Sequence, residues 1–184
     1  MTGLRARGGV VERLRRETRD DHDAIELALD WERRTASVEA YAEWLRRLHA
    51  FHGWWEPMAA ELVGDPAFFE PRRKLGLLGN DLERLGAEAP TIDVPGLALA
   101  SRAEALGSMY VLEGSTLGGK LIARRVRDVL GFEPGYHDPY GARTGAMWRV
   151  FQARLAADVE AHEEDEAVDA ARRTFRHLRE RLAG

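Results

Sequence analysis

The chain has 184 residues, a formal net charge of −4 and no cysteine. This length suits one domain that buries its own core, and the lack of cysteine excludes disulfides, thiolate metal sites and thiol nucleophiles. Charged residues make up 32% of the chain and no long uncharged apolar run occurs, so we expect no transmembrane helix, no signal peptide and a cytoplasmic location. Basic runs such as residues 72–74 are interpreted as solvated helix faces. This interpretation and the net negative charge argue against nucleic acid as a partner.

Hydrophobic residues recur at helical spacing in the first half of the chain. Residues 1–9 are expected to form a flexible N-terminus, and residues 86–95 a loop with two prolines. The helices predicted between them are about Val10 to Leu29, the segment from the N-cap Ser37 to about Leu62, and Pro71 to Leu85.

The second half begins with a helical segment from about Leu97 to Leu130, which glycines interrupt. Residues 131–145 are rich in glycine and contain two prolines, which is typical of a long ordered loop. Two more helices are expected at about 146–163 and 166–182. No β pattern, internal repeat or linker is evident, so the sequence predicts an all-α, single-domain helical bundle over residues 1–184.

The most informative segment is Tyr110-Val-Leu-Glu-Gly-Ser-Thr-Leu-Gly-Gly-Lys120. Three glycines inside a helix cost roughly 3 kcal/mol relative to alanine, so something must offset that cost. Because Gly114 and Gly118 share a face at i,i+4 spacing, two explanations stay open. Either another helix packs closely there, or a flat ligand lies directly against the backbone.

A candidate partner for such a ligand is His22, which is followed by Glu26 at i+4 on the same predicted helix face. An imidazole that binds a metal needs one nitrogen free while an acceptor holds the other, and a carboxylate one turn away can do this. Neither signal is specific alone. Together they provide an axial ligand on one helix and a backbone platform on another.

These residues resemble the biliverdin-producing haem oxygenases, particularly the bacterial branch associated with phytochromes. The series Leu14, Thr18, His22 and Glu26 is similar to the family's proximal helix. The Tyr-Val-x-Glu-Gly-Ser-x-Leu-Gly-Gly run is similar to its glycine-kinked distal helix. Tyr140-Gly141 and Trp148-x-x-Phe151 also resemble the bacterial branch, so the resemblance extends over nearly the whole chain.

The resemblance implies a haem oxygenase that uses haem as substrate and cofactor, with O2 and an external electron donor such as a reductase or ferredoxin. The products would be biliverdin, CO and ferrous iron, with a phytochrome-type protein as a possible acceptor of biliverdin. His22 would be the axial iron ligand and Glu26 its hydrogen-bond acceptor. Gly114 and Gly118 would contact the distal haem face, and Gly119 would allow the helix to bend.

One residue on the distal helix departs from better-known members of the family, and the partners of the haem propionates stay open. Ser115 stands where eukaryotic members have an aspartate, so distal proton delivery would rely on Ser115, backbone groups and ordered water. The haem propionates need basic partners, for which we consider Arg15, Arg149 and Arg154.

Two other functions are weighed against this interpretation. A non-haem di-iron oxidase would use His22 and Glu26 as metal ligands, but no clear Glu-x-x-His pair is found and the glycines stay unexplained. A haem carrier or sensor would differ only in lacking turnover. The other histidines are given no site: His49 and His52 are expected on an amphipathic face, and His137 and His177 have no evident partner.

Overall fold

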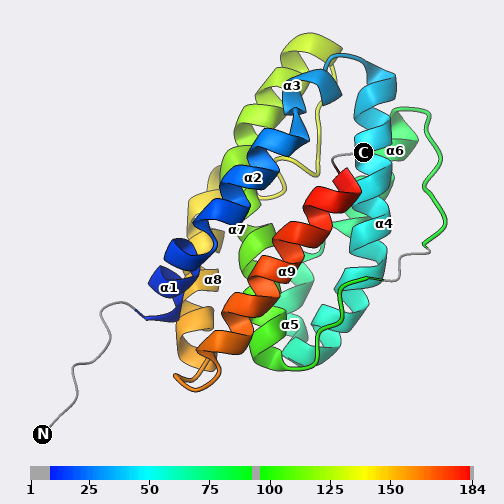
Figure 1. Cartoon of the computed structure of the whole chain (residues 1–184). Helices are drawn as coiled ribbons and strands as arrows, with labels where there is room; N and C mark the ends of the chain where they lie inside the picture. Colours follow the sequence, from blue (N-terminus) through cyan, green and yellow to red (C-terminus); the bar gives the residue numbers. More distant parts are fainter. Residues whose placement is uncertain (1–8, 93–95, 183–184) are drawn as a thin grey trace, which may run out of the picture.

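The computed structural model describes residues 9–92 and 96–182, and these residues form an all-helical bundle (Figure 1). The elements are α1 (Val10–Glu17), α2 (Arg19–Leu29), α3 (Trp31–Arg34), α4 (Val38–Val63), α5 (Pro66–Phe69), the 3-10 turn η1 (Glu70–Arg72), α6 (Leu75–Arg84), α7 (Arg102–Leu130), the 3-10 turn η2 (Gly141–Arg143), α8 (Thr144–Asp158) and α9 (Glu164–Leu182). The predicted fold class is confirmed. Within the described part of the chain, no helix is long and apolar enough to cross a bilayer. Of the predicted flexible N-terminus, residues 1–8 lie outside the described residues.

Helix α7 and helix α9 form the centre of the bundle. In Figure 1, α9 lies between α2 and α4, and it packs against α7, α2, α1 and α4. The two central helices approach closely at Gly107, where a Cβ atom would overlap the carbonyl oxygen of Ala167. A buried hydrogen-bond chain then joins three helices, because Ser108 of α7 accepts from Trp55 of α4 and from Thr174 of α9, each at 2.8 Å. These contacts connect α7 with α4 and α9 in the core.

The first predicted helix is two helices in the structure. Thr18 separates α1 from α2 with φ −105° and ψ 8°, and its buried hydroxyl donates to the Leu14 carbonyl at 2.8 Å. The Thr18 N–H donates to the same carbonyl, so no helical hydrogen bond is displaced by the hydroxyl and the break consists in the backbone angles of Thr18. Asp20 and Asp21 then occupy the first turn of α2, where negative charge is favourable. His22 therefore lies in the second turn of a separate, short helix.

Three other predicted boundaries need correction. Helix α7 is uninterrupted from Arg102 to Leu130, so the glycines do not break its hydrogen bonding. Pro71 lies inside the 3-10 turn η1, and α6 starts only at Leu75. Helix α8 ends at Asp158 because the next residue, Val159, has an extended backbone.

Candidate functional site

An exposed stripe of small and apolar residues follows one face of α7. Gly114 and Gly118 lie one turn apart on this face, and Leu117 and Leu121 flank them with 48% and 50% of their surface exposed. A Cβ atom on Gly118 would meet nothing within 4 Å, whereas one on Gly114 would lie 3.8 Å from Trp148 of α8. Close packing of another protein segment therefore does not explain Gly118. The exposed backbone at this glycine is a surface on which a flat apolar ligand can rest.

Gly119 lies on a different face of α7 from Gly114 and Gly118. A Cβ atom there would overlap the carbonyl oxygen of His137, which belongs to the loop between α7 and η2. Gly119 is buried, whereas Gly118 is exposed. The requirement for glycine at position 119 is therefore the close approach of this loop, and the ligand platform consists of Gly114 and Gly118.

The His22 side chain projects from α2 with 53% of its surface exposed. Its Nε2 atom lies 3.5 Å from Glu26 and its Nδ1 atom 3.6 Å from Asp23. Both distances exceed those of a good hydrogen bond, so either nitrogen is available to a metal while a carboxylate approaches the other. The ring also makes an edge contact with Phe175 of α9, with ring centroids 6.0 Å apart. The expected pairing of His22 with Glu26 is thus spatially feasible, and Asp23 is a second possible acceptor.

Tyr110 lies at the N-terminal end of the glycine stripe. It lies one turn before Gly114 on α7 and its ring contacts Trp148, with centroids 5.6 Å apart. Burial raises the pKa of the Tyr110 phenol, and the charge of Arg15 on α1 acts in the opposite direction.

The three predicted propionate partners have different surroundings. Arg15 on α1 and Arg149 on α8 are exposed, and α1 packs against α8. The Arg154 side chain instead contacts two carboxylates, Asp65 at 2.8 Å and Asp158, and lies over the Phe68 ring. These ion pairs hold the pKa of Arg154 above its usual value and use its Nε and Nη1 donors. Arg154 is therefore a structural residue, which leaves Arg15 and Arg149 as the candidates.

The predicted distal hydroxyl belongs to Ser115. It lies on the exposed side of α7 and donates to the Leu112 carbonyl at 2.8 Å. A hydroxyl whose proton is used in this way still has lone pairs for water. Ser115 can thus accept a hydrogen bond from solvent beside Gly114 and Gly118.

Sequence reasoning missed a buried ionic cluster behind the stripe. Glu113, the residue before Gly114, accepts from Lys74 Nζ at 2.7 Å and from the Tyr140 hydroxyl at 2.8 Å. Lys74 and Arg72 are only 3% and 5% exposed, so the interpretation of residues 72–74 as a solvated face is wrong. The cluster left only a weak signal in the sequence. Its acidic partner lies far along the chain, and a basic run by itself also fits a solvated helix face.

Two histidines also differ from their predicted surroundings. His137 has a partner after all, because its Nδ1 atom and the Tyr41 hydroxyl lie 2.9 Å apart in the core. His52 is fully buried, with its Nδ1 atom 3.1 Å from Glu56 and its Nε2 atom 3.2 Å from the Tyr136 hydroxyl. Burial lowers the pKa of both imidazoles, so both are neutral near pH 7. Both nitrogens of His52 and the Nδ1 atom of His137 are therefore engaged within the protein.

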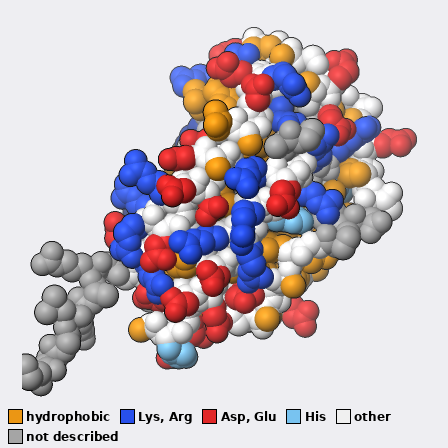
Figure 2. Space-filling view, viewed as in Figure 1, with side chains coloured by type: hydrophobic (Ala, Val, Ile, Leu, Met, Phe, Trp, Pro, Cys, Tyr) orange, Lys and Arg blue, Asp and Glu red, His pale blue; other side chains and the backbone are white. Residues whose placement is uncertain are grey.

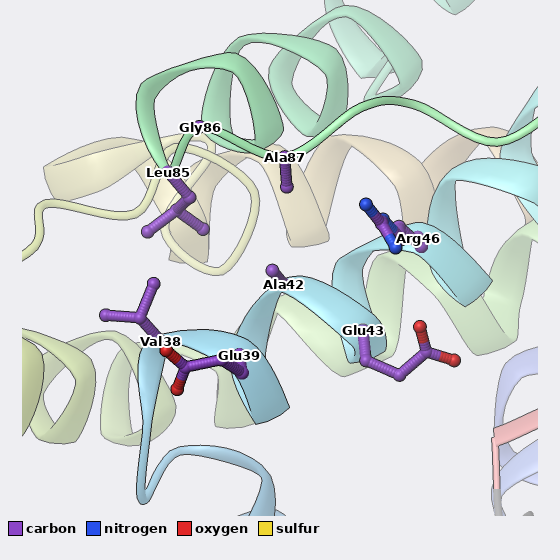
Figure 3. A pocket seen from close by; sticks show the side chains of 8 residues that line it. All are labelled: Val38, Glu39, Ala42, Glu43, Arg46, Leu85, Gly86 and Ala87. Carbon is purple, nitrogen blue, oxygen red and sulfur yellow. The ribbon is translucent and has the colours of Figure 1, made fainter.

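A surface cavity of about 290 Å³ lies elsewhere, between the start of α4 and the end of α6 (Figure 3). Figure 3 shows the apolar side chains of Val38, Ala42 and Leu85 on its walls, with Glu39, Glu43 and Arg46 along α4. None of the predicted site residues lines it. Figure 2 shows basic and acidic side chains interspersed over α2 and α9, as expected for a solvated face.

A di-iron centre is not supported by the donor atoms present. Among the described residues, one group of three possible metal ligands lies within 4.8 Å, and it consists of His22, Asp23 and Glu26 on the surface of α2. Di-iron sites in bundles need several inward carboxylates from facing helices. The donor set therefore fits a single axial imidazole with carboxylate neighbours, as a haem site requires.

Known proteins that are similar to this chain include a curated relative and two solved structures. The haem oxygenase of Xanthomonas campestris pv. campestris (strain 8004) is 32% identical over 159 residues, which cover 79% of this chain and 90% of the relative. The NO- and CO-bound haem oxygenase of Neisseria meningitidis aligns with a TM-score of 0.78 at 24% identity, over 95% of this chain and 90% of that one. The haem oxygenase of Leptospira interrogans aligns with a TM-score of 0.75 at 16% identity, over 96% and 99% of the two chains. No family model matches the chain. The structural matches, at these identities, establish the fold.

Proposed function

The chain belongs to the haem oxygenase family, and from that premise we propose that it binds haem between α2 and the glycine stripe of α7. The reaction is the oxidative cleavage of haem to biliverdin, CO and ferrous iron with O2 and reductant. The observation that carries this proposal is the exposed Gly114–Gly118 platform, which no protein segment covers at Gly118. Haem, when bound, supplies the redox-active iron and is also the ring that is opened.

On the proximal side, His22 supplies the axial nitrogen. Its exposed position in the second turn of α2 leaves room for iron, and the carboxylates of Glu26 and Asp23 lie near its two nitrogens. A carboxylate that accepts the second N–H fixes the ring orientation and makes the ligating nitrogen more basic. We assign Glu26 this role, as its i+4 position keeps it on the same face of α2.

On the distal side, the backbone of α7 approaches the ring because Gly114 and Gly118 have no side chains. Leu117 and Leu121 add apolar surface beside them, and Trp148 borders the Gly114 end. Ser115 accepts hydrogen bonds from water at this face, which places a proton source next to the reacting edge. Arg15 and Arg149 pair with the propionates and so fix the rotation of the ring in its plane.

The finer assignments also belong to this proposal. Tyr140-Gly141 and Trp148-x-x-Phe151 favour the bacterial branch associated with phytochromes, with a phytochrome-type protein as acceptor of biliverdin. A reductase or ferredoxin provides the electrons. We further propose that the whole chain is one haem oxygenase domain that functions in the cytoplasm.

The proposal is tested by adding haem, a reductant and air to the purified protein. The expected result is a Soret band that decays into the broad red absorption of biliverdin. A stable ferric or oxygenated spectrum would instead identify a haem carrier. In His22→Ala the axial-ligand signature and most of the turnover should disappear. Its circular dichroism should stay that of the wild type, since a half-exposed side chain contributes little to the core. Unchanged haem absorption in this variant would mean that another residue is the ligand.

A further inference from the structure

A single buried carboxylate joins three chain segments to α7 directly behind the haem platform. Glu113 is 2% exposed, and its Oε1 atom accepts from Lys74 and from Tyr140. Its Oε2 atom faces the Arg72 guanidinium, with Nε at 3.5 Å. These partners come from η1, from the residue before α6 and from the loop before η2. Glu113 thus fixes three elements at the position that precedes Gly114.

A second carboxylate extends the cluster into α4. The Oε1 atom of Glu56 accepts from the backbone N–H groups of Lys74 and Leu75 at 2.7 and 2.9 Å, so Glu56 caps the N-terminus of α6 from another helix. Burial opposes ionisation of Glu56, but hydrogen bonds from His52 and from these N–H groups hold its pKa below the usual range. The main chain that carries Lys74 is therefore fixed, which aims its side chain at Glu113.

The 135–140 loop is held against α7 at a second point. Asp81 of α6 accepts from the N–H groups of Gly135 and Tyr136 at 3.0 and 2.9 Å. The His137 carbonyl then lies against Gly119. The loop is thereby fixed to α7 near residue 113 through Tyr140 and near residue 119 through His137. These two points bracket the segment that contains Gly114 and Gly118.

Stability alone does not account for this arrangement. A buried ion cluster is often no more stabilising than apolar residues of the same volume, because each charge loses its hydration. Here, two facing atoms, Arg72 Nε and Glu113 Oε2, also lack a hydrogen-bond partner. What the cluster does provide is a fixed geometry, since charged groups in a dry interior tolerate few alternative arrangements.

We propose that Glu113 is a positioning residue of the haem oxygenase reaction. Its carboxylate, held by Lys74 and Tyr140, fixes the α7 backbone at Gly114 and so sets how closely the distal main chain meets the haem face. This inference rests on the proposed function. Glu113 acts through the backbone, because its side chain faces the core while Gly114 faces the stripe. The pKa of Tyr140 is raised by burial and by the Glu113 carboxylate, so the phenol stays a hydrogen-bond donor throughout the working pH range.

Two variants test the proposal with different risks to folding. Tyr140→Phe removes one hydrogen bond and no charge, while Glu113→Gln keeps the size of the side chain but removes the charge opposite Arg72. The matched control is Thr174→Val, which removes a buried hydrogen bond between α9 and Ser108 of α7 without touching the cluster. The first measurement uses haem-free protein: amide hydrogen exchange of residues 112–119 should become about tenfold faster in both cluster variants and not in the control.

The second measurement is the C–O stretching frequency of the ferrous CO complex, which senses the groups above the iron. Both cluster variants should shift this frequency and lower kcat while haem affinity stays near that of the wild type, and Thr174→Val should do neither. The proposal is wrong if the cluster variants lose only thermal stability while amide exchange at residues 112–119, the C–O frequency and kcat stay unchanged. The cluster would then have only a structural role. Wild-type turnover is the separate test of the proposed function. If the wild type made no biliverdin, the exchange experiment would still report on Glu113.

Discussion

Replacing Gly118 by leucine should have opposite effects on the haem-free and the haem-bound protein. In the haem-free protein, leucine removes the helix penalty of glycine, about 0.8–1 kcal/mol. It introduces no clash at its Cβ, because nothing lies within 4 Å of that position. For a chain of 184 residues, a gain of about 1 kcal/mol corresponds to a rise in Tm of about 2–4 °C. Differential scanning calorimetry resolves a shift of this size.

With haem present, the same leucine should be harmful. Its side chain would extend over the stripe and occupy the space of the porphyrin, so we expect haem affinity to fall by at least about tenfold, or about 1.4 kcal/mol. Wild-type protein at a haem concentration of about 100 Kd gains about 2.7 kcal/mol of stability from ligand linkage, and the variant should lose at least half of that gain. A haem titration followed at the Soret band measures the affinity directly. Wild-type haem affinity in Gly118→Leu would refute the proposal that haem lies on this part of α7.

Gly119→Ala is the matched control for this experiment. Its Cβ would overlap the carbonyl oxygen of His137, and overpacking of this kind costs about 1–3 kcal/mol. The haem-free protein should therefore lose stability in Gly119→Ala and gain it in Gly118→Leu. The sign of the change in Tm, measured by calorimetry, would then distinguish the roles of these two adjacent glycines.

Two further predictions concern charged groups. Arg15→Ala and Arg149→Ala should weaken haem binding and change the proportions of the biliverdin isomers, which chromatography resolves, with little change in Tm. Arg154→Ala should instead lower Tm and leave the isomer proportions unchanged, because its partners are Asp65 and Asp158. Burial lowers the pKa of His137 to about 3, whereas the unfolded chain titrates near 6.5. The neutral ring therefore contributes stability that is present above about pH 6.5 and is lost as the pH falls toward 3, by up to about 1.4 kcal/mol per pH unit. His137→Gln should flatten the fall in urea-unfolding free energy between pH 7 and 5, and an equally steep fall in that variant would contradict the assignment.

Most helices could be predicted because their apolar residues repeat with the helical period over many turns. The long helix α4 shows this well, since Ser37 caps it as expected and its end at Val63 differs by one residue from the prediction. Boundaries failed where one residue left the helical backbone range or where the cap came from a distant residue. Thr18 has non-helical backbone angles that the apolar pattern does not predict, and the start of α6 depends on Glu56, eighteen residues before Lys74. A local pattern does not contain such information.

The site residues divide in the same way. His22 and its i+4 neighbour Glu26 could be paired from spacing alone, because their relation is within one helix. The partners of Glu113 come from other elements, so the cluster required the tertiary fold. Arg154 was a reasonable propionate partner until the structure showed Asp65 beside it. Basic residues are the least predictable group, since their role depends on which carboxylates the fold brings near.

The glycines of α7 show why a motif alone does not assign a role to each of its residues. Gly107 packs against Ala167 of α9 and Gly119 packs against the His137 carbonyl. At Gly118, by contrast, no protein atom lies within 4 Å of an added Cβ. The first two contacts offset the helix penalty of glycine through close backbone packing in the folded protein. No protein segment packs on Gly118, so this glycine leaves an open, exposed stretch of α7 backbone. We propose that haem lies on that face, and this difference among glycines of one helix is the physical argument for the proposal.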